Sequence, residues 1–597
     1  MDVLISQNKK IHVCSREVNI MYKINLVNQN TMIECGGGRL SAACEKAGYP
    51  LNLVCGGKGT CGKCRVEVIR GGRREKVLAC QEEVTEDLDV CLTDEQLSRS
   101  AEIMTEGRSD SEIKLRPAIT KACYNCEDLI PEHCGAYLTY RDVRLLRKFS
   151  ILMADPRVKQ VTFTRFCGEP IGAEAGDTTD QIYGGAVDIG TTSVVLFACD
   201  LKTGKLLQTE SALNGQISHG ADVISRILHT MQNETGLEEL RSLIVSTLNG
   251  LIDRVEKKIP GFSQHLYHMI LCGNSTMQHL FLGLNPSGLS ADPFVNVTSE
   301  SVRIKGRDSG LNMCEFGNVE FLPLLGGFVG ADTSAVLLSL PCNDKHHLMI
   351  DLGTNGEIGV RTDNGYMVCS TACGPALEGG NISCGMRGTN GAIEKIWIRG
   401  DEVTYRVIAG EDPIGLCGSA IIDAVAELLR AGVIDSTGRM LTAEEYRKAH
   451  PGSTLADRIG ESEPGIPAFF FTRGSRPVYL NQKDVRQIQL AKSSIYSGCI
   501  TLIDEAGLTL EDIDAFYLAG AFGNYIDVDN ALSIGLLPPI ERNRIISIGN
   551  GAGQGVRMCL LDYDLMAECC RMAKKVSHLE LAATPRFMEE YIMNMNF

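Results

Sequence analysis

The chain of 597 residues is too long for a single hydrophobic core, so several domains are expected. Hydrophobic residues make up 44% of it and charged residues 22%, as in ordinary soluble globular proteins. The net charge of −16 at pH 7 disfavours nucleic acids and anionic membranes as partners. The sequence has no apolar run of transmembrane length and no signal-peptide core near its start, so we expect a cytoplasmic protein.

The 24 cysteines are scattered along the chain, some of them in apolar surroundings such as those of Cys199 and Cys272. They do not form the compact pattern of a disulfide-stapled scaffold. A reducing compartment accounts for them best, and an oxygen-poor one would also protect an exposed metal cluster.

The N-terminal part predicts a small fold of strands and one short helix. Polar and apolar residues alternate over residues 22–27, and residues 31–34 can return as a second strand, which predicts a hairpin. A short amphipathic helix over 40–47 leads into a loop, and residues 65–69 and 88–92 supply further strands.

The loop after this helix carries three cysteines, Cys55, Cys61 and Cys64, in the spacing C-x5-C-x2-C, and Cys80 follows at the end of the next hairpin. Four thiolates are the ligand set of one [2Fe–2S] cluster. The glycines of the loop let the backbone bend tightly and bring N–H groups close to the sulfur atoms. With the order of strands and helix, this pattern resembles the β-grasp ferredoxins, and its first gap is that of the vertebrate type.

Two other interpretations of the loop stay open. A structural zinc site also takes four cysteines, but usually as two separated C-x2-C pairs, and this loop has a single pair. Residues 57–63 match the phosphate-loop pattern G-x4-G-K, but Cys64 stands where that pattern needs a hydroxyl for Mg²⁺. The glycine padding and the flanking strands favour the iron–sulfur cluster.

Polar and charged residues dominate the next stretch, and residues 98–115 are predicted to be a flexible linker. Residues 116–183 then predict a small α/β domain with a helix near 140–153. A tether of this kind would let the cluster domain move.

Two further groups of cysteines need an interpretation. Within the small domain, a second metal site is conceivable, but no fourth ligand stands close by, so ordinary thiols are favoured. The cysteines of the C-terminal half lie in glycine-rich stretches and are interpreted as small buried residues. The two groups are Cys123, Cys126 and Cys134, and Cys369, Cys373, Cys384 and Cys417.

From residue 186 an apolar strand runs into the turn Asp-x-Gly-Thr-Thr and a second strand leads out again, and a similar pattern recurs later in the chain. A tight glycine turn presents N–H groups and hydroxyls to phosphate, and the aspartate can hold a hydrated Mg²⁺. Two such hairpins that face one another predict a nucleotide triphosphate clamped between two related lobes. The residues concerned are Asp188, Gly190, Thr191 and Thr192 in the first copy and Asp351, Gly353, Thr354 and Asn355 in the second.

The two hairpins resemble those of the superfamily that contains actin, sugar kinases, acetate kinase and heat-shock chaperone ATPases. The stretch 518–524 is similar to the adenosine motif of that superfamily through Gly520 and Gly523. Turn chemistry alone explains any one glycine stretch, but not the joint order of several. Together with the ferredoxin pattern, they resemble the reductive activators of corrinoid proteins, including those of methyltransferase and O-demethylase systems. The stretches that narrow the match are 273–279, 326–332, 374–380, 415–420 and 549–555.

This resemblance implies a multidomain α/β and α+β protein. Its parts are a β-grasp [2Fe–2S] ferredoxin domain (1–97), the linker (98–115), the small middle domain (116–183) and a two-lobed actin-like ATPase domain (184–597). It also implies an ATP-dependent activator, which transfers an electron from its cluster to the inactive Co(II) corrinoid of a partner protein and restores Co(I). A plant-type cluster lies near roughly −400 mV, and the target couple is expected to be lower, so ATP turnover would supply the difference.

The resemblance further implies cofactors, partners and roles. The cofactors are a [2Fe–2S] cluster, ATP and Mg²⁺, and the partners are a corrinoid protein and an upstream low-potential electron donor, with a homodimer left open. The roles are electron transfer for Cys55, Cys61, Cys64 and Cys80, placement of Mg²⁺ and water for Asp188 and Asp351, phosphate binding for Gly190, Thr191, Thr192, Gly353, Thr354 and Asn355, and the adenine pocket for Gly520 and Gly523.

Two other functions stay open. The first is an ATP-driven reductase for another target, as in activators of 2-hydroxyacyl-CoA dehydratases, but those hold a cluster inside the ATPase lobes and lack a ferredoxin domain. The second is a small-molecule kinase with a redox-sensing domain. A kinase would release a phosphorylated product, whereas an activator would release only ADP and phosphate.

Overall fold

The structure is a computed structural model that describes residues 21–29, 31–46, 49, 51, 59, 64–70, 73–92, 113–129, 142–220, 222–341, 345–353 and 355–597. The chain divides into two compact units, residues 1–99 and 100–597. Most of the predicted linker lies outside the described residues, so the four domain boundaries given above stay predictions. Of the helices that the structure describes, none combines the length and the apolar character needed to cross a membrane.

The first unit is a five-stranded mixed sheet with the strand order β2-β1-β5-β3-β4. β1 and β5 run parallel, and the other neighbours run antiparallel. Ile24 and Leu26 of β1 and Val66 and Val68 of β3 are buried, because alternate side chains of a strand point to the same face. This is the predicted β-grasp fold. Its elements are β1 (Tyr22–Leu26), β2 (Thr31–Cys35), α1 (Leu40–Lys46), β3 (Arg65–Arg70), β4 (Arg73–Leu78) and β5 (Leu88–Cys91).

The second unit contains two lobes that repeat one strand pattern. The order is β11-β10-β9-β12-β14 in lobe 1 and β17-β16-β15-β24-β25 in lobe 2, with one more edge strand in each sheet, β13 and β26. In both lobes the first strand pairs antiparallel with the second and parallel with the fourth. The repeat is the actin-like architecture that the paired hairpins predicted.

The elements of lobe 1 are β9 (Tyr183–Ile189), β10 (Ser193–Asp200), β11 (Leu206–Leu213), α4 (Val223–Gln232), α5 (Gly236–Lys258), β12 (Leu266–Gly273), α6 (Ser275–Leu282), β13 (Val302–Lys305), α7 (Gly306–Ser309), β14 (Asn318–Phe321) and α8 (Ala331–Ser339).

The elements of lobe 2 are β15 (His347–Leu352), β16 (Gly356–Thr362), β17 (Gly365–Thr371), α11 (Gln482–Glu505), β24 (Ala515–Ala519), α12 (Gly520–Tyr525), α13 (Val528–Ser533), β25 (Ile545–Gly549), α14 (Gly551–Leu561), α15 (Tyr563–Ala573), β26 (Ser577–His578) and α16 (Pro585–Met593). Inserted between β17 and α11 are β18 (Ala392–Arg399), β19 (Glu402–Val407), β20 (Gly415–Leu416), α9 (Gly418–Arg430), α10 (Ala443–Ala449), β21 (Ile459–Glu463), β22 (Ile466–Phe470) and β23 (Tyr479–Asn481).

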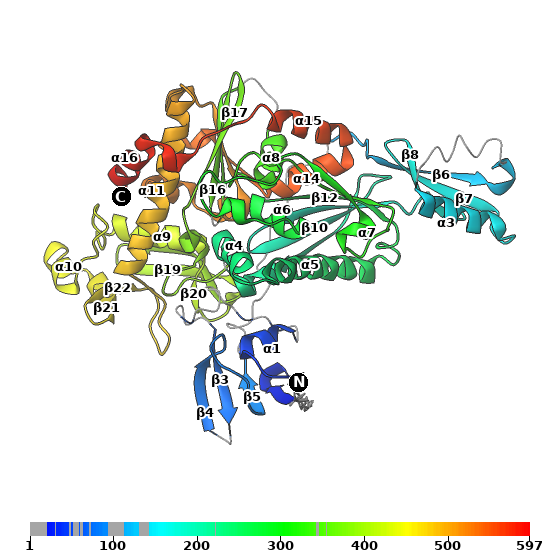
Figure 1. Ribbon diagram of the computed structural model, residues 1–597. Coiled ribbons are helices and arrows are strands. Elements are labelled where there is room, and N and C mark those ends of the chain that lie inside the picture. Colours follow the sequence, from blue (N-terminus) through cyan, green and yellow to red (C-terminus); the bar gives the residue numbers. More distant parts are fainter. Residues whose placement is uncertain are drawn as a thin grey trace, which may run out of the picture. The chain divides into compact units, whose positions relative to one another are not determined.

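Each lobe has its own hydrophobic core. α5 packs on β10 and β11 of lobe 1, and α11 packs on β16 and β17 of lobe 2 (Figure 1). Leu240, Ile244, Leu248 and Leu251 recur at helical spacing on α5, so one face of this helix is buried in the first core. The central strands β9 and β15 are apolar almost throughout, because helices cover both faces of each sheet.

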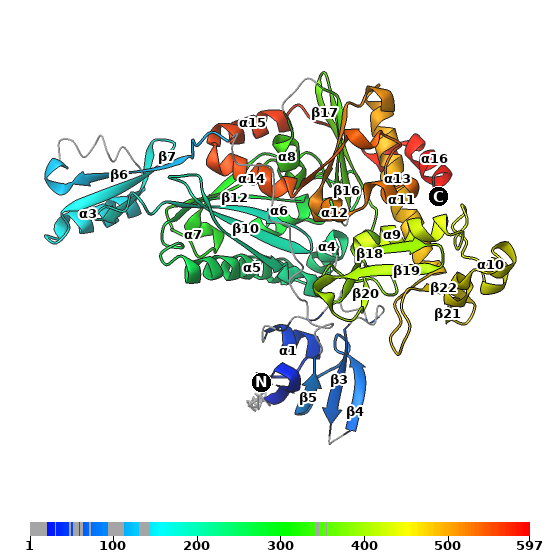
Figure 2. The same ribbon diagram turned by 180° about the vertical axis from the view of Figure 1, so that it is seen from behind.

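The helices α8 and α14 connect the two lobes (Figure 2). α8 contacts β12 of lobe 1 and β15 of lobe 2, and α14, which follows the last long strand of lobe 2, packs on α8 and β9. At their crossing a Cβ atom on Gly555 would lie 2.0 Å from the carbonyl oxygen of Ala335, and one on Gly553 would lie 2.6 Å from the ring of Phe197. Glycine is required for this close approach.

We predict that Gly555→Ala destabilises the protein by about 1–3 kcal/mol, because the added methyl group forces the two helices apart. Gly250→Ala is the matched control, since Gly250 lies in the middle of α5 with nothing within 4 Å of the new Cβ atom. The control should gain about 0.5–1 kcal/mol. Denaturant unfolding of both variants checks this, and equal stability of the two would show that the crossing is not tight.

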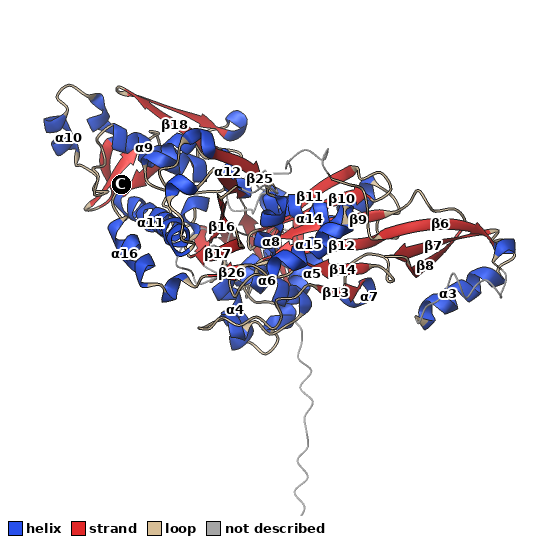
Figure 3. Ribbon diagram, turned by 90° about the horizontal axis from the view of Figure 1, so that it is seen from above, coloured by secondary structure: helices blue, strands red, loops and turns tan. Residues whose placement is uncertain are grey.

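Within the predicted small domain, the described residues form the three-stranded sheet β6-β7-β8 with α3 beside it (Figure 3). Phe149 and Phe163 are buried in a separate core that also includes Phe316 of lobe 1. The predicted helix near 140–153 corresponds to α3. The elements are β6 (Ile119–Asn125), α3 (Val143–Ala154), β7 (Gln160–Phe166) and β8 (Glu169–Ala175).

A buried polar network also joins the small sheet to lobe 1. Lys121 of β6 lies 2.8 Å from Glu174 of β8, and Tyr267 of β12 donates a hydrogen bond to the same carboxylate. Burial by itself would raise the pKa of Glu174, but hydrogen bonds from His265, Lys121 and neighbouring groups lower it to about 2. The carboxylate is therefore ionised at neutral pH and holds the two parts together.

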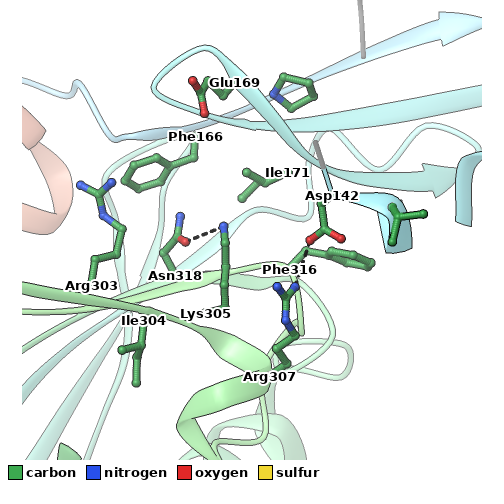
Figure 4. Close-up of a pocket in the computed structure, with 12 residues that line it drawn as sticks. Asp142, Phe166, Glu169, Ile171, Arg303, Ile304, Lys305, Arg307, Phe316 and Asn318 are labelled. Carbon is green, nitrogen blue, oxygen red and sulfur yellow. Dashed lines mark hydrogen bonds and ion pairs between the residues drawn. The ribbon is translucent and has the colours of Figure 1, made fainter. Parts of the chain in front are cut away.

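A cavity of about 470 Å³ lies between the small sheet and lobe 1 (Figure 4). Lys305 and Arg307 of lobe 1 point towards it from the side opposite Phe166 (Figure 4). The ammonium of Lys305 donates to Asn318 Oδ1 at 2.9 Å, and Arg307 lies 3.0 Å from Asp142. The contact between the two parts therefore combines polar pairs with shared hydrophobic packing.

Candidate functional site

The two predicted phosphate hairpins end at equivalent strand positions. Asp188 lies near the end of β9 and Asp351 near the end of β15, each on the first strand of its lobe. The turns that follow are closed by backbone hydrogen bonds, from Gly190 N–H to Ser193 O and from Gly353 N–H to Asn355 O, both 2.9 Å long. The same local chemistry therefore presents the same groups from each lobe.

Side chains of neighbouring elements hold the first hairpin in place. The amide of Asn214 donates to Gly190 O, and that of Asn274, the N-cap of α6, donates to Thr191 Oγ1, both at 2.9 Å. The guanidinium of the fully buried Arg226 donates to Thr191 O. The turn is fixed before any ligand binds, which lowers the entropy cost of binding.

Gly520 supports the second hairpin. Its φ of +86° lies in the left-handed region, and a Cβ atom there would lie 2.5 Å from Asp351 Oδ1. A side chain at this position would therefore strain the backbone and displace the carboxylate.

The two hairpins face a cavity of about 360 Å³ between the lobes. Among the residues predicted for the site, Thr354 lies outside the described residues. Gly523 of α12 is not among the residues that line the cavity, and it lies against Leu518 of β24. The predicted residues that do line it are Asp188, Gly190, Thr191, Thr192, Asp351, Gly353, Asn355 and Gly520.

Four carboxylates of this lining face each other: Asp188, Asp332, Asp351 and Glu357. Burial, and next the charge of Asp332, raises the pKa of both Asp188 and Asp351 to about 7. Burial also raises the pKa of Asp332 to about 6 and that of Glu357 well above its ordinary value. These shifts mean that the carboxylates cannot all be ionised together without a cation.

The donor set fits Mg²⁺. Carboxylate oxygens are the ligands that this hard cation prefers, and it usually retains several waters and binds substrate phosphates as well. The hydroxyls and backbone N–H groups of the turns lie beside the carboxylates and can hold those phosphates. The cavity therefore has the groups to hold a nucleotide with its metal ion. The role of each lining residue in this binding is a proposal.

Sequence reasoning missed several residues of the lining. Asp332 lies in the stretch 326–332, which the sequence analysis noted only for its glycines. Its position in the first turn of α8, directly after that glycine stretch, could have indicated a site residue. Glu357 is directly opposite Asp351 in the β15–β16 ladder, which the hairpin register could have revealed. Asn550, whose amide lowers the pKa of Asp188, lies in the stretch 549–555 that supported the resemblance, but its side chain was not singled out. The cation Arg387 gave no recognisable signal.

The first unit holds the predicted cluster ligands that are described. Cys64 precedes β3 and Cys80 follows β4, and the pairing of these strands brings the two thiols to one end of the hairpin. Ala79 N–H donates to Cys64 O at 3.0 Å, and both cysteine side chains are buried. The amide of Gln81 approaches Cys80 Sγ at 3.7 Å, as a donor that would tune a sulfur ligand.

The other two predicted ligands, Cys55 and Cys61, lie outside the described residues. Between them, Gly59 has a φ of +76°, and a Cβ atom there would lie 2.9 Å from the side chain of Gln81. Gly59 therefore lies close to Gln81, the neighbour of Cys80. These residues fit an iron–sulfur group.

The remaining cysteines behave as ordinary thiols where they are described. Cys123 and Cys126 donate to two different backbone carbonyls, and Cys134 lies outside the described residues. In lobe 2, Cys369, Cys373 and Cys417 are buried and Cys384 is half-buried. Burial raises the pKa of the first three thiols, which opposes the thiolate form that a cluster needs.

The β-grasp fold with its cysteine loop, and the duplicated lobes with their acidic cleft, define an iron–sulfur protein that carries an actin-like ATPase domain. Family models agree with this class. The model of the 2Fe-2S iron-sulfur cluster binding domain matches residues 24–85, that of the RACo middle region matches 183–344, and that of the C-terminal domain of RACo, the ASKHA domain, matches 345–597.

Two relatives are similar over most of their length. The chain is 42% identical to "Corrinoid activation enzyme RamQ" of Eubacterium limosum over 583 residues. This aligned region covers 94% of this chain and 96% of the relative. It is 25% identical to "[Co(II) methylated amine-specific corrinoid protein] reductase" of Methanosarcina barkeri, over 70% of this chain and 77% of that protein.

A solved structure is similar as well. The structure of "Reductive activator for corrinoid,iron-sulfur protein" superposes with a TM-score of 0.72 at 29% identity, covering 96% of this chain and 98% of that one. The chain belongs to the family of reductive activators of corrinoid proteins. Its ferredoxin domain accordingly binds an iron–sulfur cluster.

We predict that Asp188→Asn and Asp351→Asn each lower the rate of ATP hydrolysis by roughly 100-fold, because each removes a carboxylate placed to hold Mg²⁺. The visible absorption of the cluster should stay unchanged, since the cysteines belong to the other compact unit. A coupled assay of phosphate release checks this. Hydrolysis at the normal rate in either variant would remove that residue from the site.

The raised carboxylate pKa values predict a pH dependence. Free carboxyl groups titrate near about pH 4, whereas Asp188 and Asp351 titrate near 7 in the folded protein without metal. Their contribution to stability is therefore favourable at low pH and is lost as pH rises through 7. Mg²⁺ needs the ionised form, so its affinity should rise by about tenfold or more between pH 6 and pH 8.

Calorimetric titration of the nucleotide-free protein with Mg²⁺ at several pH values measures this affinity. Asp188→Asn is the control in which the dependence should become shallower. An affinity that does not change with pH would mean that these carboxylates are ionised without the metal ion.

Proposed function

We propose that the protein is an ATP-dependent reductive activator of a methyltransferase or O-demethylase corrinoid protein, which transfers one electron to the inactive Co(II) corrinoid and restores Co(I). The observation that carries the proposal is the presence of an iron–sulfur domain and an acid-lined actin-like cleft in one chain. The printed names of the relatives, a corrinoid activation enzyme and a Co(II) corrinoid protein reductase, support the same target.

The electron balance is simple. One electron leaves the iron–sulfur domain and enters the partner's Co(II), and an upstream low-potential donor replaces it. Cys55, Cys61, Cys64 and Cys80 would hold a [2Fe–2S] cluster, which when bound supplies a one-electron carrier. Burial of Cys64 and Cys80 keeps water from the sulfur atoms on the hairpin side.

The second unit would supply the driving force. Asp188, Asp332 and Asp351 would hold Mg²⁺, while Thr191 and Asn355, with the neighbouring turns, would hold the phosphates. ATP and water become ADP and phosphate, and the net charge in the cleft changes. Asp332 begins α8, so this change acts directly on a helix that contacts both lobes. The lobes can thereby drive a conformational change in the complex with the partner.

Both other functions receive less support. A small-molecule kinase needs no redox domain to transfer phosphate. The carboxylates that line the cleft are suited to ATP hydrolysis itself. An activator of the dehydratase type would hold a cluster inside the ATPase lobes. Cys369, Cys373 and Cys417 of lobe 2 are instead buried thiols with raised pKa values, and none of them belongs to a group of described side chains that could hold a metal ion.

The test is an anaerobic assay of Co(II) reduction with the purified protein, a chemical reductant and a cognate corrinoid protein, with and without ATP. We predict that Co(I), detected by its visible spectrum, forms only with ATP. Cys64→Ser should abolish it while ATP hydrolysis persists, and Asp351→Asn should abolish it while the cluster persists. Reduction that is equally fast without ATP, or that survives Cys64→Ser, would contradict the proposal.

A further inference from the structure

A second cluster of titratable side chains lies on lobe 1, away from the residues that line the cleft. His219 ends the 3-10 helix η4 (Gly215–His219), His229 lies in the last turn of α4, and Glu239 lies in the first turn of α5. Their possible ligand atoms all lie within 4.8 Å of one another. His229 Nε2 is 2.9 Å from Glu239 Oε2, and the two imidazole centroids are 4.2 Å apart.

Neighbouring polar groups orient two of these side chains. Thr235 Oγ1 donates to the second carboxylate oxygen of Glu239 at 2.5 Å. The amide of Asn233 lies 3.1 Å from His229 Nδ1 and leaves Nε2 facing the carboxylate. These contacts hold the His229 ring and the Glu239 carboxylate in place beside each other.

We propose that His219, His229 and Glu239 bind a divalent transition-metal ion such as Zn²⁺. Two imidazoles and one carboxylate with an open fourth position are a known ligand set for this class of ion, whereas Mg²⁺ and Ca²⁺ prefer oxygen ligands. Bonds of about 2.0–2.2 Å bring ligand atoms to roughly 3.4 Å from one another. The side chain of Glu239 is 43% exposed, so a small rotation of it would let the set close around the ion.

The ion would stabilise the elements behind the first phosphate hairpin. Arg226 precedes His229 by one helical turn on α4 and donates to Thr191 O in that hairpin. It also donates to Gly220 O, directly after His219. A metal ion that joins η4, α4 and α5 therefore fixes the position of Arg226, and it holds the hairpin that is proposed to bind phosphate.

The test is a calorimetric titration of the untagged full-length protein with Zn²⁺ in excess Mg²⁺. The variant is His229→Ala, and the matched control is His346→Ala, since His346 also pairs with a carboxylate, Asp363 at 3.0 Å, but has no third ligand among the residues that the structure describes. All cysteines are present in each protein, so their Zn²⁺ binding cancels in the comparison. We expect the unaltered protein and His346→Ala to bind one more Zn²⁺ than His229→Ala.

Glu239→Gln keeps the size of the side chain and should weaken this one site by roughly tenfold or more. Circular dichroism without Zn²⁺ shows whether each variant folds, and His219→Ala replaces His229→Ala if the latter does not. Equal Zn²⁺ stoichiometry in all variants would overturn the proposal. If a histidine variant loses the Zn²⁺ site while Glu239→Gln binds Zn²⁺ with unchanged affinity, Glu239 is not a ligand and the three-ligand set is overturned.

Discussion

Four carboxylates that share one desolvated cavity are the constraint on which the second unit depends. Asp188 and Asp351 come from the two lobes, Asp332 from the helix between them, and Glu357 from the strand paired with Asp351. Burial of these carboxylates, and next the repulsion between like charges at close range in a medium of low dielectric, raises their pKa values. A divalent cation removes the repulsion, so the cavity is built to respond to a metal–nucleotide complex.

The duplicated fold converts this local response into movement of larger parts. Each lobe supplies one aspartate at the end of its first strand, and α8 and α14 cross so closely that Gly555 has no room for a side chain. Packed helices of this kind shift as rigid bodies instead of deforming, because protein interiors are dense. Charge neutralised in the cleft can therefore change the relative position of the lobes, which is how ATP turnover would act on a bound partner.

Much of the fold followed from the sequence, because its signals are local. The strand–turn–strand pattern around Asp188 and Asp351 predicted both hairpins, and the cysteine spacing predicted a loop that closes onto the β3–β4 hairpin. β4 was not delimited, because its residues are mostly charged and exposed and give no alternating pattern. The adenine-pocket role of Gly523 rested on motif similarity and stays a prediction, and a Cβ atom on this residue would lie 3.5 Å from the side chain of Leu518.

The missed parts of the site depend on contacts between distant segments. Asp332 belongs to the carboxylate cluster only because α8 begins beside both hairpins, and Arg226 reaches Thr191 from a helix that motif comparison did not single out. No spacing rule connects such residues along the chain. They become visible once the lobes are assembled.

The central claim is that electron transfer and ATP turnover are coupled within one molecule. The most direct measurement is a single-turnover experiment in which the protein is reduced, freed of excess reductant and mixed with a Co(II) corrinoid protein and ATP. The account predicts that loss of the reduced iron–sulfur signal and appearance of Co(I) have the same amplitude and rate, and that both require ATP. Oxidation of the iron–sulfur domain without an equal yield of Co(I), or an equal yield in the absence of ATP, would contradict it.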